Sequence, residues 1–332
     1  MRILFIGGTG LISTAVTHHL LDNGHELYLL NRGNHRAAES KGVKTLTADI
    51  RNPEAVRAAL GPLTFDTVTN WIAFSPEHIR QDVELFRGRT KQYVFISSAS
   101  AYEKPCRHYQ ITESTPLRNP YWKYSRDKIA CERLLEEEYE ATGFPYTVVR
   151  PSHTYGQGRL PFAVNQSSCD WTLIDRMLRG EPMLVHGDGT SLWTVTHNTD
   201  FAAAFTGVLG RPCAIGQAYH ITSDEVQTWN NIYKTYGYAL GVEPRLVYVP
   251  STVIEAHTPV YAGTLLGDKA ESVVFDNRKI KALVPDWACK VPLVEGARRA
   301  LAWYEARPEE RRVDERYNAS IDRLIADCVP KF

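Results

Sequence analysis

The sequence carries no excess of either charge, because 38 Lys and Arg residues balance 38 Asp and Glu residues among 332. Proteins that bind nucleic acid or anionic membranes through a broad surface carry a surplus of basic residues, so we expect neither partner. No apolar run approaches the roughly 18 residues that a membrane-spanning helix needs. The run that follows Met1 is also too short for a signal peptide. We therefore expect a cytoplasmic protein.

Cysteine is scarce, and its spacing excludes two classes of site. The six cysteines are widely separated and form no Cys-x-x-Cys pair, so we expect reduced thiols and no bound metal. A hydrophobic content of 43% and a charged content of 23% are ordinary for a globular protein with a sizeable core. The length suits one large domain or two fused lobes. The cysteines are Cys106, Cys131, Cys169, Cys213, Cys289 and Cys328.

Short apolar runs alternate with amphipathic stretches through the first half of the chain. This alternation predicts an α/β fold with a doubly wound parallel sheet of the Rossmann type, because parallel strands need helical crossovers. The expected strands are Ile3–Ile6, Glu26–Leu30, Val43–Thr47, Thr67–Asn70, Tyr93–Ser97 and Tyr146–Arg150. The expected helices are Leu11–Asn23, Pro53–Leu60, His78–Arg87 and Lys123–Ala141.

The regular alternation of strands and helices ends after Pro151. Pro and Gly become frequent there, and the expected elements are shorter, with no regular order of strands and helices. We therefore expect a dinucleotide-binding Rossmann domain over residues 1–155. Residues 156–332 are expected to form mainly a smaller substrate-binding lobe, with some elements returning to the Rossmann sheet.

A glycine-rich segment lies between the first expected strand and the first expected helix. Gly7 permits a tight turn there, and Gly10 lets the backbone approach a pyrophosphate at the helix N-terminus, where Leu11 and Ile12 begin the helix. Ser13 replaces the usual third glycine and is still small. A glycine-rich turn alone can be structural, but this position favours a dinucleotide-binding turn.

The residues after the second and third strands bear on the choice between NAD and NADP. NAD sites usually carry an acid after the second strand, whereas Asn31 and Arg32 stand there. Arg32 could hold a 2′-phosphate through charge-assisted hydrogen bonds, which favours NADP, or could stack on adenine as a loop residue. Asp49 and Ile50, after the third strand, are expected to flank the adenine.

Together with further motifs along the chain, these residues make the sequence resemble the extended short-chain dehydrogenases/reductases of the NAD-dependent epimerase/dehydratase family. The chain is similar in particular to an atypical branch that includes chloroplast RNA-binding proteins. The motifs keep the order and approximate spacing of the family over residues 1–305. The matching segments are Gly7–Ser13, Asp49–Ile50, Phe95–Tyr102, Tyr124–Lys128, Arg150–Gly156 and Gly187–Asp200.

Tyr124 and Lys128 form a Tyr-x-x-x-Lys pair on an expected helix. The four-residue spacing places the phenol and the ammonium on one helix face, and a nearby cation favours the phenolate, so Tyr124 can act as a general base. The resemblance implies that Lys128 also binds the nicotinamide ribose. The alternative is a purely structural role, with a buried tyrosine beside a surface lysine.

Ser98 is the expected third member of the catalytic set, because it lies four residues before Tyr102, the spacing of the family. Its hydroxyl would hold the reacting oxygen near Tyr124, although Ser97 and Ser100 compete for this role. Dehydratases of the family place an Asp-Glu pair just after this serine. Ala99 and Ser100 stand there instead, so dehydration is not expected.

The segments after the fourth and sixth strands should line the crevice. Asn70 is expected beside the nicotinamide and His153 near the nicotinamide or the substrate, while Ser98, Ser100, Tyr155 and Trp193 are expected to contact the substrate. For His153 and Trp193 a purely structural role is equally open.

Nucleotide-sugar enzymes of the family carry an arginine shortly after the Gly-Asp-Gly turn, to clamp the substrate diphosphate. The segment Ser191–Trp193 occupies that place here. A sugar or nucleoside-like polyol without a clamped diphosphate is therefore favoured. Arg159 or Arg278 could supply the charge instead, which keeps a nucleotide sugar open.

The resulting expectation is an NAD(P)-dependent epimerase that transiently oxidises a secondary hydroxyl and keeps its cofactor tightly bound. One alternative is a dehydrogenase or reductase that releases the ketone, since it would use the same Ser-Tyr-Lys set. Another is an inactive, nucleic-acid-binding relative, and a homodimer is left open.

Overall fold

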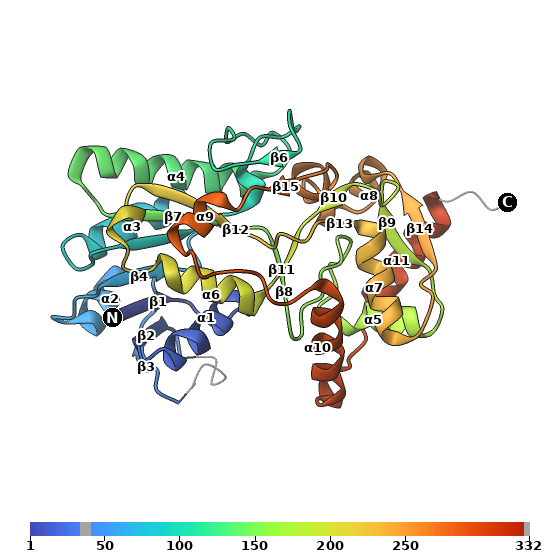
Figure 1. Cartoon of the computed structure of the whole chain (residues 1–332), viewed down its shortest axis with the longest axis horizontal. Helices are drawn as coiled ribbons and strands as arrows, with labels where there is room; N and C mark the ends of the chain where they lie inside the picture. The colour runs from blue at the N-terminus through green and yellow to red at the C-terminus, as the bar shows by residue number, and fades with distance from the viewer. Residues whose placement is uncertain (34–40, 329–332) are drawn as a thin grey trace.

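Seven parallel strands form the central sheet of the chain. The structure is a computed structural model that describes residues 1–33 and 41–328. The strands lie in the order β12-β7-β5-β4-β1-β2-β3, and every neighbouring pair runs parallel, which confirms the predicted doubly wound α/β fold (Figure 1). They are β1 (Arg2–Ile6), β2 (Glu26–Asn31), β3 (Lys44–Thr47), β4 (Thr67–Asn70), β5 (Tyr93–Ile96), β7 (Tyr146–Pro151) and β12 (Gln217–Ile221).

Helices cover both faces of this sheet, and this is why its inner strands are apolar on both sides. One face packs against α1 (Leu11–Asp22) and α6 (Asn198–Val208), through side chains such as Phe5, Phe201 and Phe205. The other face packs against α2 (Pro53–Leu60), α3 (Pro76–Phe86) and α4 (Lys123–Thr142). The helices and strands that the sequence predicted agree with these bounds to within two residues at each end.

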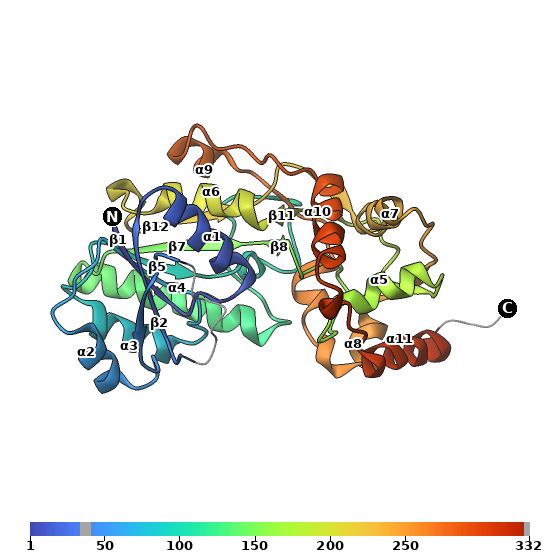
Figure 2. The same cartoon turned by 90° about the horizontal axis from the view of Figure 1, so that it is seen from below.

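The second half of the chain contributes both to this sheet and to a separate core. Strand β12 and helix α6 belong to the sheet although both lie beyond residue 156. The remaining helices are α5 (Trp171–Leu178), α7 (Trp229–Leu240), α8 (Ser251–His257), α9 (Arg278–Leu283), α10 (Leu293–Glu305) and α11 (Glu315–Cys328). All of these except α9 gather beside the sheet (Figure 2).

Four short strand pairs lie outside the central sheet. Three pairs are parallel: β6 (Gln110–Ile111) with β15 (Val274–Phe275), β8 (His153–Tyr155) with β11 (Val195–His197), and β9 (Met183–His186) with β14 (Leu246–Val249). Strand β10 (Leu192–Trp193) runs antiparallel to β13 (Gln227–Thr228). The core of this part is rich in aromatic side chains, among them the stacked rings of Trp193 and Trp229.

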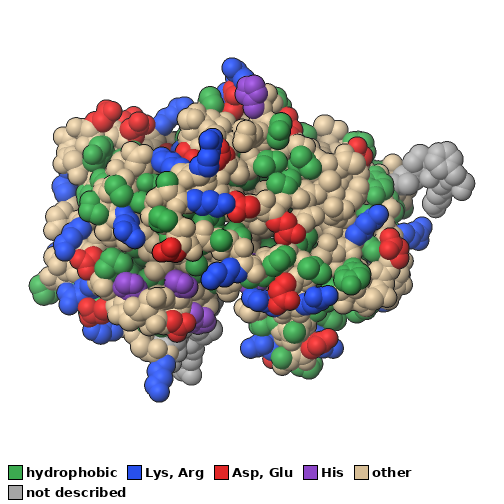
Figure 3. Space-filling model, viewed as in Figure 1, with side chains coloured by type: hydrophobic (Ala, Val, Ile, Leu, Met, Phe, Trp, Pro, Cys, Tyr) green, Lys and Arg blue, Asp and Glu red, His purple; other side chains and the backbone are tan. Residues whose placement is uncertain are grey.

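On the face that Figure 3 shows, acidic and basic side chains intermingle, and no broad region carries a single sign of charge. Within the described residues, no helix is both long and apolar enough to cross a bilayer, and no cluster of three or more His, Cys, Asp or Glu side chains is arranged to hold a metal.

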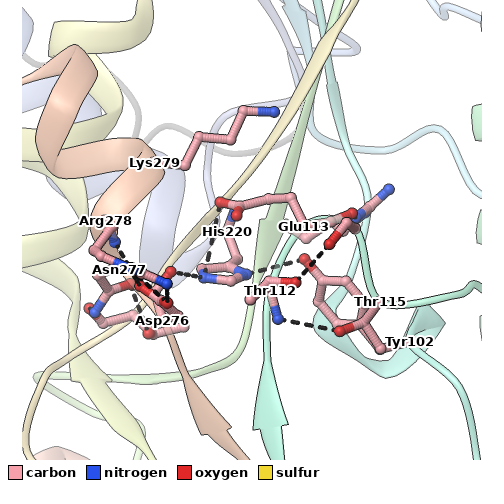
Figure 4. Close-up of polar contacts among 12 residues, drawn as sticks. Tyr102, Thr112, Glu113, Thr115, His220, Asp276, Asn277, Arg278 and Lys279 are labelled. Atoms are coloured by element: carbon pink, nitrogen blue, oxygen red, sulfur yellow. Dashed lines mark hydrogen bonds and ion pairs between the residues drawn. The ribbon is translucent and has the colours of Figure 1, made fainter.

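His220 ties the loop after β5 to the segment that precedes α9. Its Nδ1 lies 2.9 Å from the hydroxyl of Tyr102, and its Nε2 lies 2.9 Å from the carbonyl oxygen of Asp276 (Figure 4). The backbone amide of His220 also donates to Glu113 at 3.2 Å. Burial lowers the pKa of His220, which favours the neutral ring, so Nε2–H donates to the carbonyl while Nδ1 accepts from Tyr102.

A buried ion pair joins helix α4 to strand β7. The Arg150 guanidinium donates to both carboxylate oxygens of Glu132, with the closest contact at 2.6 Å, and the two side chains are only 6% and 7% exposed. Ser97 donates to the same carboxylate. Because both charges are desolvated, removal of one partner leaves the other uncompensated.

We predict that Glu132→Ala lowers the free energy of unfolding by about 3–5 kcal/mol, since Arg150 is then left charged and buried. Urea-induced unfolding followed by circular dichroism measures this change. Glu137→Ala, at an exposed position of the same helix, should change stability by less than about 0.5 kcal/mol. Equal effects of the two substitutions would contradict the role of the ion pair.

Candidate active site

A cleft of about 660 Å³ opens where the glycine-rich turn, the carboxyl ends of the strands and a segment of the second half meet. Eight of the sixteen predicted site residues line it. The described lining includes Gly7, Gly10, Leu11, Ile12, Ser98, Ser100, Tyr124 and His153, together with Trp71, Ile72, Trp122, Ser152, Arg159, Asp268 and Lys269. The strand order reverses between β1 and β4, so this is the crevice in which doubly wound sheets bind ligands.

The glycine-rich turn has the geometry that a dinucleotide needs. Gly7 has φ +80°, and a Cβ at this position would lie 2.9 Å from Ile72, so only glycine fits. Gly10 is different, because a Cβ there would meet nothing in the chain closer than Ser13 Oγ at 3.7 Å. Packing within the chain therefore does not require a glycine at position 10, whereas the approach of a pyrophosphate to the N-terminus of α1 would.

A second pocket of about 320 Å³ adjoins the turn and is lined by Asn31, Arg32, Asp49 and Ile50. The sequence analysis assigned these four residues to the adenosine end. Asn31 uses its side-chain oxygen to accept from the backbone of Gly33 at 2.8 Å. Arg51, which the sequence reasoning missed, also lines this pocket and donates to the carbonyl oxygen of Ile72 at 2.8 Å.

The three predicted catalytic residues come from two adjacent segments, the end of β5 and the first turns of α4. Ser98 and Tyr124 both line the cleft, and the Ser98 hydroxyl is close enough to the phenol to lower the pKa of Tyr124. The Lys128 ammonium lies under the Tyr124 ring, 5.6 Å from its centroid, and donates at 2.7 Å to the carbonyl oxygens of both Ala73 and Ile96.

Burial controls the protonation of this pair. It raises the pKa of Tyr124 to about 12, opposed only in part by the nearby Ser98 hydroxyl, and it lowers the pKa of Lys128 to about 8. The sequence argument expected Lys128 to lower the pKa of Tyr124, and the described chain shows the opposite direction. The physical reason is that desolvation of the phenolate outweighs an ammonium that is directed at two carbonyls.

The structure separates the three candidate serines. Ser97 donates to the buried carboxylate of Glu132 and does not line the cleft. Ser98 and Ser100 both line it, with their hydroxyl oxygens 2.9 Å apart, and Ser100 accepts from Ser125 at 2.7 Å. Of these serines, Ser98 is the one whose hydroxyl affects the pKa of Tyr124, which favours Ser98 for the role near the reacting oxygen.

Asn70 lies beneath the cleft and does not line it. Its side chain is fully buried, donates to Asp82 and accepts from the backbone amide of Ile72 at 2.8 Å. Asn70 therefore holds the segment that contacts both pockets. His153 lines the cleft, and burial lowers its pKa to about 3, so the ring is neutral.

Among the described residues, Tyr155 and Trp193 lie in the aromatic core and not in the cleft lining. Trp193 stacks on Trp229 with ring centroids 5.4 Å apart. Of the two arginines considered for a diphosphate, Arg278 is paired with Asp276 and lies outside the cleft lining, whereas Arg159 lines it.

Three residues of the cleft lining were not predicted from the sequence, because they belong to no recognised motif. Asp268 and Lys269 belong to a short π-helical segment, Leu265–Lys269, far along the chain from the other lining residues. Trp122 lies two residues before Tyr124 and packs against its ring. Only the proximity of Trp122 to the Tyr-x-x-x-Lys pair offered a signal in the sequence.

The residues present fit a nicotinamide dinucleotide. Within the described part of the chain, the Oγ of Ser152 and the Nδ1 of His153 are buried and have no hydrogen-bond partner, although both residues line the cleft. Such orphaned polar atoms call for a polar ligand group. Together with the space at Gly10 and the adjoining pocket at Asn31 and Arg32, they match an elongated cofactor with polar groups at both ends.

The comparisons with known proteins agree with this geometry. The sequence profile of the NAD dependent epimerase/dehydratase family matches residues 3–222. The chain is 25% identical over 263 residues to the chloroplast stem-loop binding protein of 41 kDa b of Arabidopsis thaliana, covering 74% of this chain and 65% of that protein. It is 24% identical over 252 residues to 2′-dehydrokanamycin reductase of Streptomyces kanamyceticus, covering 76% and 70%. The chain thus spans about two thirds of the length of these relatives.

Among solved structures, the fold is similar to that of dTDP-glucose 4,6-dehydratase from Bacillus anthracis in complex with NAD. The TM-score is 0.74 at 20% sequence identity, over 93% of this chain and 98% of that chain. This likeness confirms the fold class.

Asp82, which supports Asn70, generates a prediction about pH. Its Oδ2 accepts from Tyr93 at 2.5 Å and from Asn70, and burial raises its pKa from the usual 3.8 to about 6. The folded protein therefore holds this proton more tightly than the unfolded chain. The associated stability is fully present below pH 3.8 and is lost as the pH rises through about 6.

We predict that Asp82→Asn removes this loss and makes the variant more stable than the parent at pH 7, by about 2–3 kcal/mol. Urea unfolding at several pH values between about 4 and 7 measures the difference between the two proteins. Asp22→Asn, at an exposed position of α1, is the control and should leave the pH profile unchanged. Parallel profiles for the parent and Asp82→Asn would contradict the assignment.

Proposed function

The chain belongs to the NAD dependent epimerase/dehydratase family, and from this premise we propose that it is an NAD(P)-dependent epimerase of a sugar or nucleoside-like polyol. The observation that carries the proposal is the position of Ser98, Tyr124 and Lys128. Ser98 and Tyr124 both line the cleft that the glycine-rich turn enters, and the Lys128 ammonium lies beneath the Tyr124 ring. A secondary hydroxyl placed against Ser98 and Tyr124 is positioned to lose its proton.

NAD(P), when bound, supplies the acceptor and donor of the hydride. The Ser98 hydroxyl holds the reacting oxygen. The Tyr124 phenolic oxygen takes the proton from it once the positive charge of oxidised NAD(P) favours the phenolate. Lys128 keeps its positive charge beneath the Tyr124 ring because two carbonyl oxygens solvate it. When the ketone is reduced again from its opposite face, Tyr124 returns the proton and the configuration at that carbon is inverted.

The residues after Ser98 support epimerisation over dehydration. Ala99 and Ser100 are both buried, and neither carries a carboxyl group that could expel water. A reductase remains the second candidate, because the relative from Streptomyces kanamyceticus is named as a reductase and the same three residues would serve. The two differ in whether the ketone leaves the site.

The charges in the cleft support a substrate without a clamped diphosphate. Arg159 lines the cleft, but its guanidinium donates at 3.1 Å to Asp170, a carboxylate that is only 3% exposed. Its charge is therefore largely compensated. The zero net charge and the intermingled surface charges likewise give no support to nucleic-acid binding, the property that the name of the Arabidopsis relative indicates.

We predict that Tyr124→Phe reduces turnover by roughly 10²–10⁴-fold, because it removes the positioned acid and base. Turnover is followed by NMR detection of the epimer and by nicotinamide absorbance, with free sugars, glycosides, nucleosides, UDP-glucose and dTDP-glucose as substrates. Binding of NAD(P)H, measured by its fluorescence, should remain nearly unchanged. Full activity of the Tyr124→Phe variant would contradict the proposed mechanism.

We also predict that Arg32→Ala weakens NADP binding selectively, by about 1.5–3 kcal/mol, as expected for the loss of a charge-assisted hydrogen bond to the 2′-phosphate. Calorimetric titration with NADP and with NAD measures both affinities. Arg57→Ala, on the solvent side of α2, is the control. Equal weakening of both cofactors would show that Arg32 stacks on adenine instead.

A further inference from the structure

One part of the cleft lining belongs neither to the glycine-rich turn nor to the sheet. It consists of Trp122, which immediately precedes α4, and of Asp268 and Lys269 in the π-helical segment Leu265–Lys269. We call these three residues the Trp122 wall. The Lys269 ammonium lies 5.9 Å from the centre of the Trp122 ring, so the two segments are in contact.

The Trp122 wall lies beside the reacting position. The rings of Trp122 and Tyr124 have centroids 4.7 Å apart and an interplanar angle of 43°. A molecule whose hydroxyl contacts the Tyr124 phenol therefore has aromatic surface next to it. Sugar rings suit such a surface, because their C–H groups form apolar patches that pack on aromatic rings, while their hydroxyls point outward.

Asp268 and Lys269 supply the polar groups that those hydroxyls need. Their side chains are 18% and 15% exposed and form an ion pair of 2.9 Å at the cleft. The carboxylate accepts hydrogen bonds and the ammonium donates them, so the pair can satisfy hydroxyls in both senses. Its net charge is zero, so the pair offers no uncompensated positive charge to a diphosphate group.

The wall is held in place before any ligand binds, and Asn119 is the residue that does this. Asn119 is 2% exposed, and its amide nitrogen donates to the carbonyl oxygens of Ser100 at 2.8 Å and Gly267 at 2.6 Å. Its side-chain oxygen accepts from the backbone amides of Tyr121 and Trp122, both at 3.1 Å. One amide group thus joins the serine loop, Trp122 and the π-helical segment.

Close packing and two buried donors fix the other side of the wall. A Cβ at Gly267 would lie 2.9 Å from Trp122, so the π-helical segment can approach Trp122 only with glycine there. The carbonyl oxygen of Lys269 lies 3.2 Å from the donating Nε1 of Trp229 and 3.1 Å from the Nε2 of His186. A binding surface that is ordered in advance costs less entropy when a ligand binds.

We propose that the Trp122 wall is the subsite for an uncharged sugar ring, and that this subsite, rather than a diphosphate clamp, selects the substrate. The proposal rests on the proposed function, because it places the oxidised carbon of that ring at Tyr124. Trp122 packs against the ring face, and Asp268 and Lys269 hydrogen-bond its hydroxyls. Free sugars or simple glycosides are then the substrate class.

Saturation-transfer difference NMR tests this on the NADPH-loaded protein. The probes are the methyl glycosides of glucose, galactose, mannose and glucosamine, with UDP as the charged probe. We expect saturation of the ring protons of at least one glycoside, with a Kd near about 1 mM. Trp122→Ala should weaken that affinity about tenfold or more, and Trp122→Phe should retain most of it. Tyr238→Ala removes an aromatic residue that is 70% exposed and does not line the cleft, so it is the matched control.

Asp268→Asn gives a second, nearly isosteric test that leaves the shape of the wall intact. It should weaken glycoside binding about fivefold, because charged hydrogen bonds are lost. It should strengthen the binding of UDP, because the Lys269 ammonium is then no longer compensated. Unchanged UDP affinity in this variant contradicts the proposal. If Trp122→Ala does not fold, Trp122→Phe and Asp268→Asn still decide it.

Three results overturn the subsite: tight UDP binding by the parent protein without glycoside binding, glycoside binding that is indifferent to Trp122→Ala, and no binding of any probe. These readouts need no turnover. Trp122-dependent glycoside binding by a protein without activity would disprove the proposed function and keep the subsite. Activity with glycoside binding that does not depend on Trp122 would do the reverse.

Discussion

The buried ammonium of Lys128 is the constraint on which the rest of the site depends. It is only 2% exposed, and it reaches the carbonyl oxygens of Ala73, after β4, and Ile96, at the end of β5. A cation withdrawn from water needs such acceptors. By satisfying Lys128, the chain fixes helix α4 against the ends of two adjacent strands. Tyr124, one turn earlier on α4, is thereby placed beside Ser98, which follows β5.

One face of α4 also connects the site to the central sheet and to the second half of the chain. Tyr124, Lys128 and Glu132 are four residues apart and lie along one face of α4, in the order cleft, strand ends and sheet. Glu132 holds Ser97 and Arg150, and the Arg150 guanidinium packs 4.9 Å from the centre of the Tyr102 ring. Tyr102 then contacts His220, which binds the segment before α9. Helix α4 and the second half of the chain are thus joined by one continuous polar network.

The sequence prediction succeeded where a pattern lies within a short stretch of the chain, and it failed where residues far apart in the sequence come together. Strand and helix periodicity is local, and the glycine-rich turn and the Tyr124–Lys128 pair each lie within one element or at one junction, so they were recognisable. Trp193 was expected at the substrate because of its position in a family pattern, but two-residue strand β10 turns it onto Trp229 in the core. Asp268 and Lys269 carry no local pattern, and only the tertiary contact through Asn119 brings them to the cleft.

The charges around the cleft bear on the direction in which Tyr124 works. Arg159 is compensated by Asp170 and Lys269 by Asp268, so Lys128 is the described cation that lies beneath the phenol. With a pKa of about 12, Tyr124 keeps its proton at neutral pH in the described chain, which equips it to protonate the oxygen of a ketone. To act as a base, it needs further positive charge close by, because desolvation otherwise disfavours the phenolate. Because the peripheral cations are compensated and Lys128 lies under the phenol, the proposed mechanism confines acid and base chemistry to the position between Ser98 and Tyr124.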